Sequence, residues 1–320
     1  MGFDYRHHPL RDCRPRRTSP APALHPLTRT LTSIAGVKVG HWTHPEVPTG
    51  CTVVVLPEPN VTTVEVRGGA PGTRETALLA VGMRVEQVQA ILLTGGSAFG
   101  LAAADGVVTE LARQGKGHPT PAGPVPIVPG AVVFDLSMEG ERPKPDAFSG
   151  AAAYMAATAD PVEMGRIGAG AGTSAAKWRG FEYLVFTGIG SAVTETPDGH
   201  SVGALVVLNP VGDVFTLEGE PLTGGNLVPG PPGIRPHPIV NTVLAALVTD
   251  AAMTRAELTR LAVRAHDAVG ACVRPAHTRF DGDVVFVSAV GDEKGDVDLA
   301  AEAAFVATGR AIESAVRASI

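Results

Sequence analysis

The chain has 320 residues, of which 44% are hydrophobic and 18% charged, a balance typical of a globular protein with a large core. The formal net charge of −6 argues against a general nucleic-acid binder, because such proteins are basic. Three scattered cysteines are too few for a disulfide framework or a zinc site, and no apolar run reaches the roughly 18 residues of a membrane span. We therefore expect a cytoplasmic protein with neither a membrane nor a nucleic-acid partner.

Residues 1–30 differ from the rest of the chain, since they are basic, proline-rich and without hydrophobic periodicity. This composition predicts a disordered tail. No internal repeat or linker follows, so residues 31–320 are expected to form a single domain.

The first half of that domain alternates short apolar runs with helical patterns. A helix is expected from Glu75 up to the buried strand Ala90–Leu93, and Gly115 marks the end of the next helix. In chain order the expected elements are strands 36–42, 51–58 and 61–69, helix 75–89, strand 90–93, helix 97–115, strand 124–136 and helix 146–159.

The second half begins with a glycine-rich loop and ends on two helical patterns. Thr254 and Glu257 form a capping box at the start of the first of these helices. The expected elements are loop 165–180, strands 181–193 and 201–214, loop 215–240, strand 242–249, helix 254–271, strand 283–289 and helix 299–317. Strands and helices without strict alternation predict a layered α/β (α+β) fold.

Strand 242–249 starts on a polar residue, Thr242, directly after a loop. If strands 242–249 and 283–289 are parallel neighbours joined by the intervening helix, their starts lie side by side. Asp281 and Asp283 would then lie beside the threonine. A threonine hydroxyl needs a base, and cleavage of the Asn241–Thr242 bond would supply one as a new α-amino group.

Plainer interpretations of these residues stay open at this point. Thr242 is an ordinary residue for a strand edge, and Asp-Gly is a common turn pair. A metal site formed by His277, Asp281 and Asp283 is a further alternative, since carboxylates bind hard cations.

Seven blocks in fixed order carry a resemblance to a known family: VRGGAPGTRET, LLTGGSAFGLAAADGV, PIVPGAVVFDL, GAGAGTSAAKW, VGALVVLNPVGDV, NTVLAALVTDA and RPAHTRFDGDVVF. Over residues 31–320 the chain resembles the DmpA-like aminopeptidases and the nylon-oligomer hydrolases (NylC). These are self-processing N-terminal-nucleophile hydrolases. The resemblance implies a four-layer αββα sandwich, related to that of the ornithine acetyltransferases, and a precursor that cuts itself.

Carried onto matching positions, the resemblance implies a cut between Asn241 and Thr242, giving chains 1–241 and 242–320. Thr242 becomes the nucleophile, and Asp281 and Asp283 match the acidic pair that contacts it. Asn209 matches the amide of the oxyanion hole, which stabilises developing negative charge without carrying charge itself.

Two further positions follow from the same resemblance. Lys177 matches a lysine near the nucleophile, whose charge would lower the pKa of the new amine. Relatives can carry tyrosine where this chain has Phe134, so a phenolic hydroxyl is missing here and the substrate preference is open.

The resemblance implies an aminopeptidase or amidohydrolase that acts on short peptides or amides with a free amino end. It requires no metal or organic cofactor, and it implies a homo-oligomer, a tetramer of processed pairs. Two rival functions are an acyltransferase of related fold and an uncut, non-catalytic binding protein.

Three other features carry weaker signals. The loop Gly168–Ser174 lacks the Gly-Lys-Ser/Thr ending of a phosphate cradle, so close backbone approach explains its glycines better. Ser97 does not lie in the Gly-x-Ser-x-Gly pattern of a nucleophile elbow. His266 and His277 flank the end of a helix, where packing or capping competes with a role as catalytic base.

Overall fold

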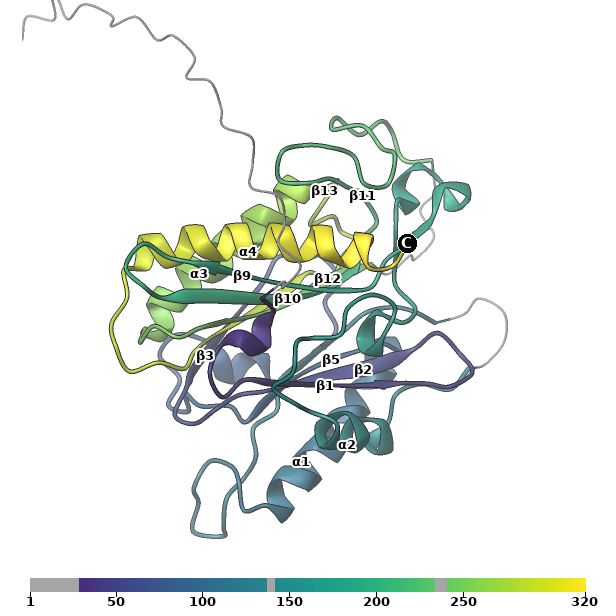
Figure 1. The fold of residues 1–320 in the computed structure, drawn as a ribbon. Coiled ribbons are helices and arrows are strands. Elements are labelled where there is room, and N and C mark those ends of the chain that lie inside the picture. The colour runs from purple at the N-terminus through teal and green to yellow at the C-terminus, as the bar shows by residue number, and fades with distance from the viewer. Residues whose placement is uncertain (1–28, 137–141, 234–240) are drawn as a thin grey trace, which may run out of the picture.

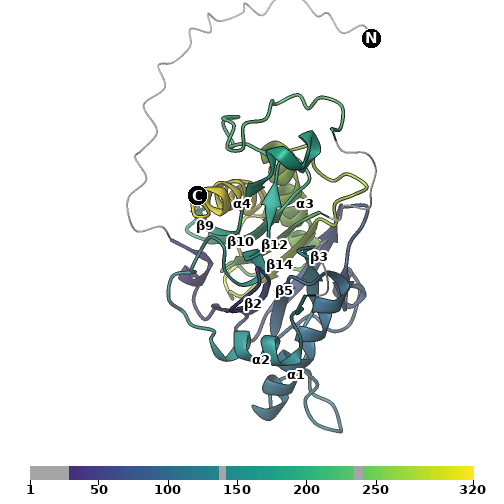
Figure 2. The same ribbon diagram turned by 90° about the vertical axis from the view of Figure 1, so that its right-hand side faces the viewer.

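The computed structural model describes residues 29–136, 142–233 and 241–320. All of the predicted N-terminal tail except Arg29 and Thr30 lies outside these residues. Two five-stranded sheets lie face to face, and a pair of helices covers the outer face of each (Figures 1 and 2). The predicted four-layer αββα sandwich is therefore confirmed.

The first sheet has the strand order β1-β2-β5-β6-β4, and α1 and α2 cover its outer face. Its elements are β1 (Lys38–Thr43), β2 (Gly50–Val55), β4 (Thr73–Arg74), β5 (Ala90–Thr94), β6 (Gly130–Val132), α1 (Ala103–Arg113) and α2 (Ala147–Met155). Strands β5 and β6 are parallel, and the other pairs are antiparallel.

The second sheet has the order β3-β14-β12-β10-β9, and α3 and α4 cover its outer face. Its elements are β3 (Val61–Val66), β9 (Ile189–Glu195), β10 (Ser201–Asn209), β12 (Thr242–Thr249), β14 (Val284–Ala289), α3 (Arg255–Cys272) and α4 (Val297–Arg317). The capping box of Thr254 and Glu257 is present at the start of α3.

Short elements complete the described chain. Strands β7 (Ser174–Ala175) and β8 (Val185–Phe186) pair with each other, as do β11 (Asp213–Val214) and β13 (Val273–Arg274). Short 3₁₀ helices lie at Leu31–Ser33, Thr76–Leu79, Ser97–Ala102, Gly168–Gly170, Lys177–Arg179 and Phe181–Tyr183.

The sequence of strand β12 is apolar without interruption because both faces of the strand are buried. Its alternate side chains enter two different cores, because successive residues of a strand point to opposite faces. Leu244, Ala246 and Val248 pack between the two sheets. Val243, Ala245 and Leu247 pack against α3 and α4. The strand that begins at Thr242 is thus buried on both faces and held rigidly.

The helix predicted over residues 75–89 is wrong, because only Thr76–Leu79 form a helical turn. The guanidinium of Arg255, which is buried, explains the difference. It donates hydrogen bonds to the main-chain carbonyls of Thr62, Ala80, Met83 and Val85, at 2.6 to 3.1 Å. The three of these carbonyls that lie within residues 75–89 are turned toward the guanidinium and away from the direction of the i to i+4 bonds of a helix.

Two predicted strands are also shorter than expected. The stretch 124–136 contributes only β6, and 181–193 divides into a 3₁₀ turn, β8 and β9. Among the described residues, no helix is both long enough and apolar enough to cross a membrane.

Candidate active site

Strands β12 and β14 are parallel neighbours, which is the condition under which Asp281 and Asp283 were expected beside Thr242. Leu244 of β12 lies opposite Val284 of β14, and one further bridge joins Asn241 to Asp281. The start of β12 therefore lies beside the Phe280–Asp283 segment, although about 40 residues separate them. Thr242, Asp281 and Asp283 are all buried, each at 1% exposure.

The main chain fixes the peptide bond between Asn241 and Thr242 on both sides. The Asn241 N–H donates to the Phe280 carbonyl at 2.9 Å, and the Gly282 N–H donates to the Asn241 carbonyl oxygen at 2.7 Å. The Thr242 hydroxyl donates to that same oxygen at 2.5 Å. The hydroxyl thus lies directly beside the carbonyl that precedes it.

The two predicted carboxylates hold main chain around this bond and do not accept from the Thr242 hydroxyl. Asp283 accepts from the Val243 N–H through Oδ1 at 2.7 Å. Asp281 accepts from the Val211 N–H at 3.2 Å and from the Thr278 hydroxyl at 2.6 Å. Burial, together with the nearby charge of Asp283, raises the pKa of Asp281 to about 6.

Asn209 ends β10 and lies opposite Thr242 in the ladder with β12. Its Oδ1 accepts from the Ser174 N–H at 3.1 Å and from Lys177 Nζ at 2.9 Å. Its Nδ2 donates to the Phe134 carbonyl at 3.1 Å. Because an amide nitrogen carries two hydrogens, one N–H of Asn209 can still donate to another acceptor.

Lys177 follows Ala176, which has a left-handed φ of 64°, and this turn directs the lysine side chain into the interior. The side chain is buried and its ammonium contacts Asn209. Burial lowers the pKa of Lys177 to about 7, although the negative charge of Asp281 acts in the opposite direction. Both protonation states of the amine are therefore accessible near neutral pH.

The structure brings Asn241, Thr242, Asn209, Lys177, Asp281 and Asp283 into one buried cluster through the contacts above. Sequence reasoning missed the roles of Ser174, Thr278 and Gly282. Gly282 has a particular requirement, since a Cβ there would lie 2.9 Å from the Thr242 hydroxyl oxygen and 2.6 Å from the Ala70 carbonyl oxygen. The glycine of the Asp-Gly pair thus allows the Ala70 carbonyl and the Thr242 hydroxyl to lie close to the main chain at residue 282, in addition to its usual role in a turn.

His266 in α3 and His277 in the loop before β14 lie next to each other, with ring centroids 4.9 Å apart. His277 Nδ1 contacts Asp283 Oδ2 at 2.7 Å, whereas Asp281 faces Thr278 and Val211. The alternative metal site at these three residues has no geometric support, because no group of three or more potential ligands converges within the described residues.

The remaining motifs have structural explanations. A Cβ on Gly168 would lie 2.4 Å from the Thr52 hydroxyl, so the glycines of the 168–174 loop permit close packing, as predicted. The N–H of Ser97, at the start of a 3₁₀ helix, donates to the carbonyl of Val133, the residue after β6.

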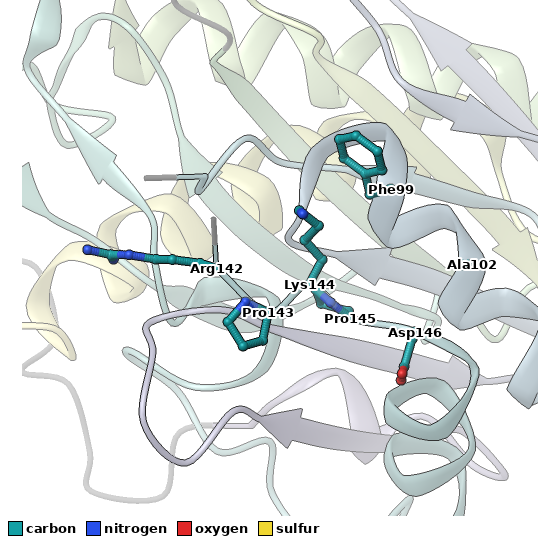
Figure 3. Close-up of a pocket in the computed structure, with 7 residues that line it drawn as sticks. All are labelled: Phe99, Ala102, Arg142, Pro143, Lys144, Pro145 and Asp146. Carbon is teal, nitrogen blue, oxygen red and sulfur yellow. The ribbon is translucent and has the colours of Figure 1, made fainter. Parts of the chain in front are cut away.

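A depression with a volume of about 560 Å³ lies beside the start of α2 (Figure 3). The ring of Phe99 and the ammonium of Lys144, 4.9 Å apart, stand at one side of it. A much narrower pocket shares Arg142 and Pro143 with it and reaches Asp135, the residue after Phe134. Thr242 lines neither of these two pockets.

Comparison with known proteins identifies the family. The model of peptidase family S58 matches residues 29–320. The chain is 38% identical over 289 residues to an uncharacterized aminopeptidase of Mycobacterium tuberculosis. The aligned region covers 82% of this chain and 81% of that protein. It is 33% identical over 270 residues to a 6-aminohexanoate-oligomer endohydrolase of Paenarthrobacter ureafaciens, with 78% and 72% covered.

Solved structures agree on the fold. The L-aminopeptidase D-Ala-esterase/amidase of Ochrobactrum anthropi, described as a variant of the Ntn hydrolase fold, superposes with a TM-score of 0.71 at 20% identity, covering 91% of this chain and 86% of its own. A Burkholderia sp. beta-aminopeptidase gives 0.69 at 22% identity, with 90% and 84% covered. The chain therefore belongs to peptidase family S58 and is an enzyme that hydrolyses peptide or amide bonds.

Proposed function

We propose that the chain is a precursor that cuts itself between Asn241 and Thr242 and then works as an aminopeptidase or amidohydrolase with Thr242 as nucleophile. The observation that carries the proposal is the geometry of this bond. The Thr242 hydroxyl lies against the Asn241 carbonyl, whose oxygen already accepts from the Gly282 N–H at 2.7 Å.

In self-cleavage, Thr242 Oγ attacks the carbonyl carbon of Asn241. The C–N bond breaks, the hydroxyl proton passes to the departing nitrogen, and an ester joins Asn241 to the threonine oxygen. Water then hydrolyses the ester and releases the two chains. The Gly282 N–H points at the oxygen on which negative charge develops, and such a preorganised donor stabilises the transition state.

In turnover, the freed α-amine of Thr242 accepts the proton of its own hydroxyl as the oxygen attacks a substrate amide. The reference pKa of such an amine is about 7.7–8.0, so much of it is neutral near neutral pH. A protonated Lys177 would lower that pKa further. Asn209 lies opposite Thr242, and its second N–H would donate to the oxyanion.

Asp281 and Asp283 act by holding the peptide groups around the nucleophile. Asp283 binds the N–H that follows Thr242, and Asp281 binds the Val211 N–H, two residues after Asn209. A fixed site costs no reorganisation at the moment of reaction. This arrangement supports positioning, with no direct proton transfer to either carboxylate.

The substrates we propose are short peptides or amides with a free amino end. The relatives' names support this class, since they include aminopeptidases and a hydrolase of 6-aminohexanoate oligomers. The chemistry as written needs no cofactor. Residues 31–320 would form one hydrolase domain, cut into 1–241 and 242–320.

We further propose a cytoplasmic homo-oligomer, a tetramer of processed pairs. Cys51 and Cys272 are free thiols, which suits a reducing compartment. Large apolar side chains on the α2 side of the molecule support a contact with a second copy. Phe99, Phe148 and Met155 are each at least 65% exposed there.

The test is to trap the acyl-enzyme. The cut protein is mixed with an amide substrate that has a free amino end, quenched in acid and analysed by mass spectrometry. The proposal predicts one acyl group on the fragment that begins with Thr242, and none when the amino end of the substrate is acetylated. An acyl group on any other residue would contradict it.

A further inference from the structure

His277 lies in the loop before β14, and both of its ring nitrogens face acceptors. Nδ1 lies 2.7 Å from Asp283 Oδ2, and Nε2 lies 3.2 Å from the main-chain carbonyl oxygen of His266. A carbonyl oxygen can only accept, so Nε2 must carry a hydrogen. A neutral imidazole has a single N–H and could then only accept from Asp283 at Nδ1.

The surroundings favour the doubly protonated ring. Asp283 is 1% exposed and accepts through both oxygens, from the Val243 N–H and from the His277 N–H. An opposite charge beside a buried carboxylate offsets part of the cost of burying it. Burial lowers the pKa of His277, but the hydrogen bond and charge of Asp283 outweigh that effect, so the pKa is raised.

Other charged groups near the ring do not change this result. Asp281 also favours the protonated ring. His266 is itself held neutral, because burial lowers its pKa to about 4. Arg67, whose charge acts on His266, is paired with Glu65 at 2.8 Å.

The backbone at this residue supports a specific function. His277 has a φ of 53°, in the left-handed region that costs energy for a residue with a side chain. Its own N–H donates to Asp283 Oδ2 at 3.2 Å, so main chain and ring converge on one oxygen. Strain of this kind persists where the surrounding contacts over-determine the conformation.

We propose that His277 is a positioning residue whose imidazolium fixes Asp283, so that Asp283 Oδ1 holds the Val243 N–H and thereby aims Thr242 at its target carbonyl. This inference rests on the proposed role of Thr242 as nucleophile. His277, which lies outside the cluster, would then set the geometry of attack. Because its ring titrates, that geometry would depend on pH.

The protonation state can be measured without any activity. Histidine-labelled Thr242→Ala protein, which would stay uncut, is titrated by nuclear magnetic resonance of the ring nitrogens. We expect a pKa for His277 above the reference of about 6.5, and a fall of at least about one unit in the additional variant Asp283→Asn. A ring that is neutral below that reference pH would overturn the inference.

The functional effect is measured on self-cleavage and on kcat and KM of the cut enzyme. His277→Asn is the test variant, because asparagine tolerates a positive φ but carries no charge. We expect both rates to fall about tenfold with little change in KM, since about 1.4 kcal/mol of positioning corresponds to that factor. His277→Lys, which restores a cation, should recover part of the loss.

The matched control is His266→Gln. It alters a buried histidine in contact with His277 but leaves the accepting carbonyl in place, and its pH profile should stay that of the parent. If His277→Asn is cut at the parental rate with the parental pH profile, the inference is wrong while the proposed function stands. If the parent itself is never cut, the proposed function fails, and the titration still decides the ring state.

Discussion

Replacing Gly282 with alanine should slow self-cleavage without unfolding the protein. The added Cβ would lie 2.6 Å from the Ala70 carbonyl oxygen and 2.9 Å from the Thr242 hydroxyl oxygen, both closer than ordinary contact. The first neighbour is main chain and cannot rotate away, because the Ala70 N–H is bonded to the Asp281 carbonyl at 2.9 Å. The main chain at residue 282 must therefore shift to relieve the first overlap, and the Thr242 hydroxyl must move to relieve the second.

The size of the effect follows from the overlap. Overpacking by one methyl group costs about 1–3 kcal/mol. Where that cost appears as displacement of the attacking oxygen, each 1.4 kcal/mol is about tenfold in rate, so cleavage should slow by about 5- to 150-fold. The full-length band is followed with time on a denaturing gel after synthesis in a cell-free system.

Gly270→Ala is the matched control for this experiment. Gly270 lies inside α3, and a Cβ there meets nothing within 4 Å. The same change of residue should leave cleavage unaltered and raise stability by up to about 1 kcal/mol, as alanine does in a helix. Cleavage of Gly282→Ala at the parental rate would refute the reasoning, because the hydroxyl would then not need its observed position.

Three more outcomes are expected, the first two measured on Thr242→Ala protein so that cutting does not interfere. Arg255→Leu should lower the free energy of unfolding in urea by about 3 kcal/mol, because four carbonyls lose a buried charged donor. The free energy of unfolding should rise with pH above about 7, because Lys177 still binds a proton in the unfolded chain after it has released that proton in the folded protein. Lys177→Met should flatten this dependence on pH. An unchanged dependence would contradict the lowered pKa of Lys177. Finally, the Thr242→Ser variant should still be cut, as followed on a gel, because a hydroxyl remains at this position. A serine variant that stays uncut would count against the Thr242 hydroxyl as the nucleophile.

The four-layer sandwich and the site residues Asn209 and Lys177 were predicted from the family resemblance, whereas local patterns alone predicted only a layered α/β fold. The apolar run of β12, the helix α3 and an assumed parallel pairing with β14 placed the Asp-Gly-Asp segment beside Thr242. That placement needed only strand periodicity and the topology of a crossover connection.

The parts that were missed depend on long-range contacts. The expected helix after Glu75 is absent because Arg255, about 175 residues later, captures its carbonyls. The hydrogen-bond partners of Asp281 and Asp283 could not be predicted from the sequence either. Asp283 meets a main-chain N–H and a histidine, and no pattern of spacing shows which atom a buried side chain reaches.

Intact-mass analysis with N-terminal sequencing of the purified protein tests the central claim most directly. The account predicts two chains in equal amounts, the smaller beginning with Thr242, and a single uncut chain for Thr242→Ala. An unmodified parent that stays one 32.8 kDa chain on prolonged incubation, yet hydrolyses amides, would contradict it.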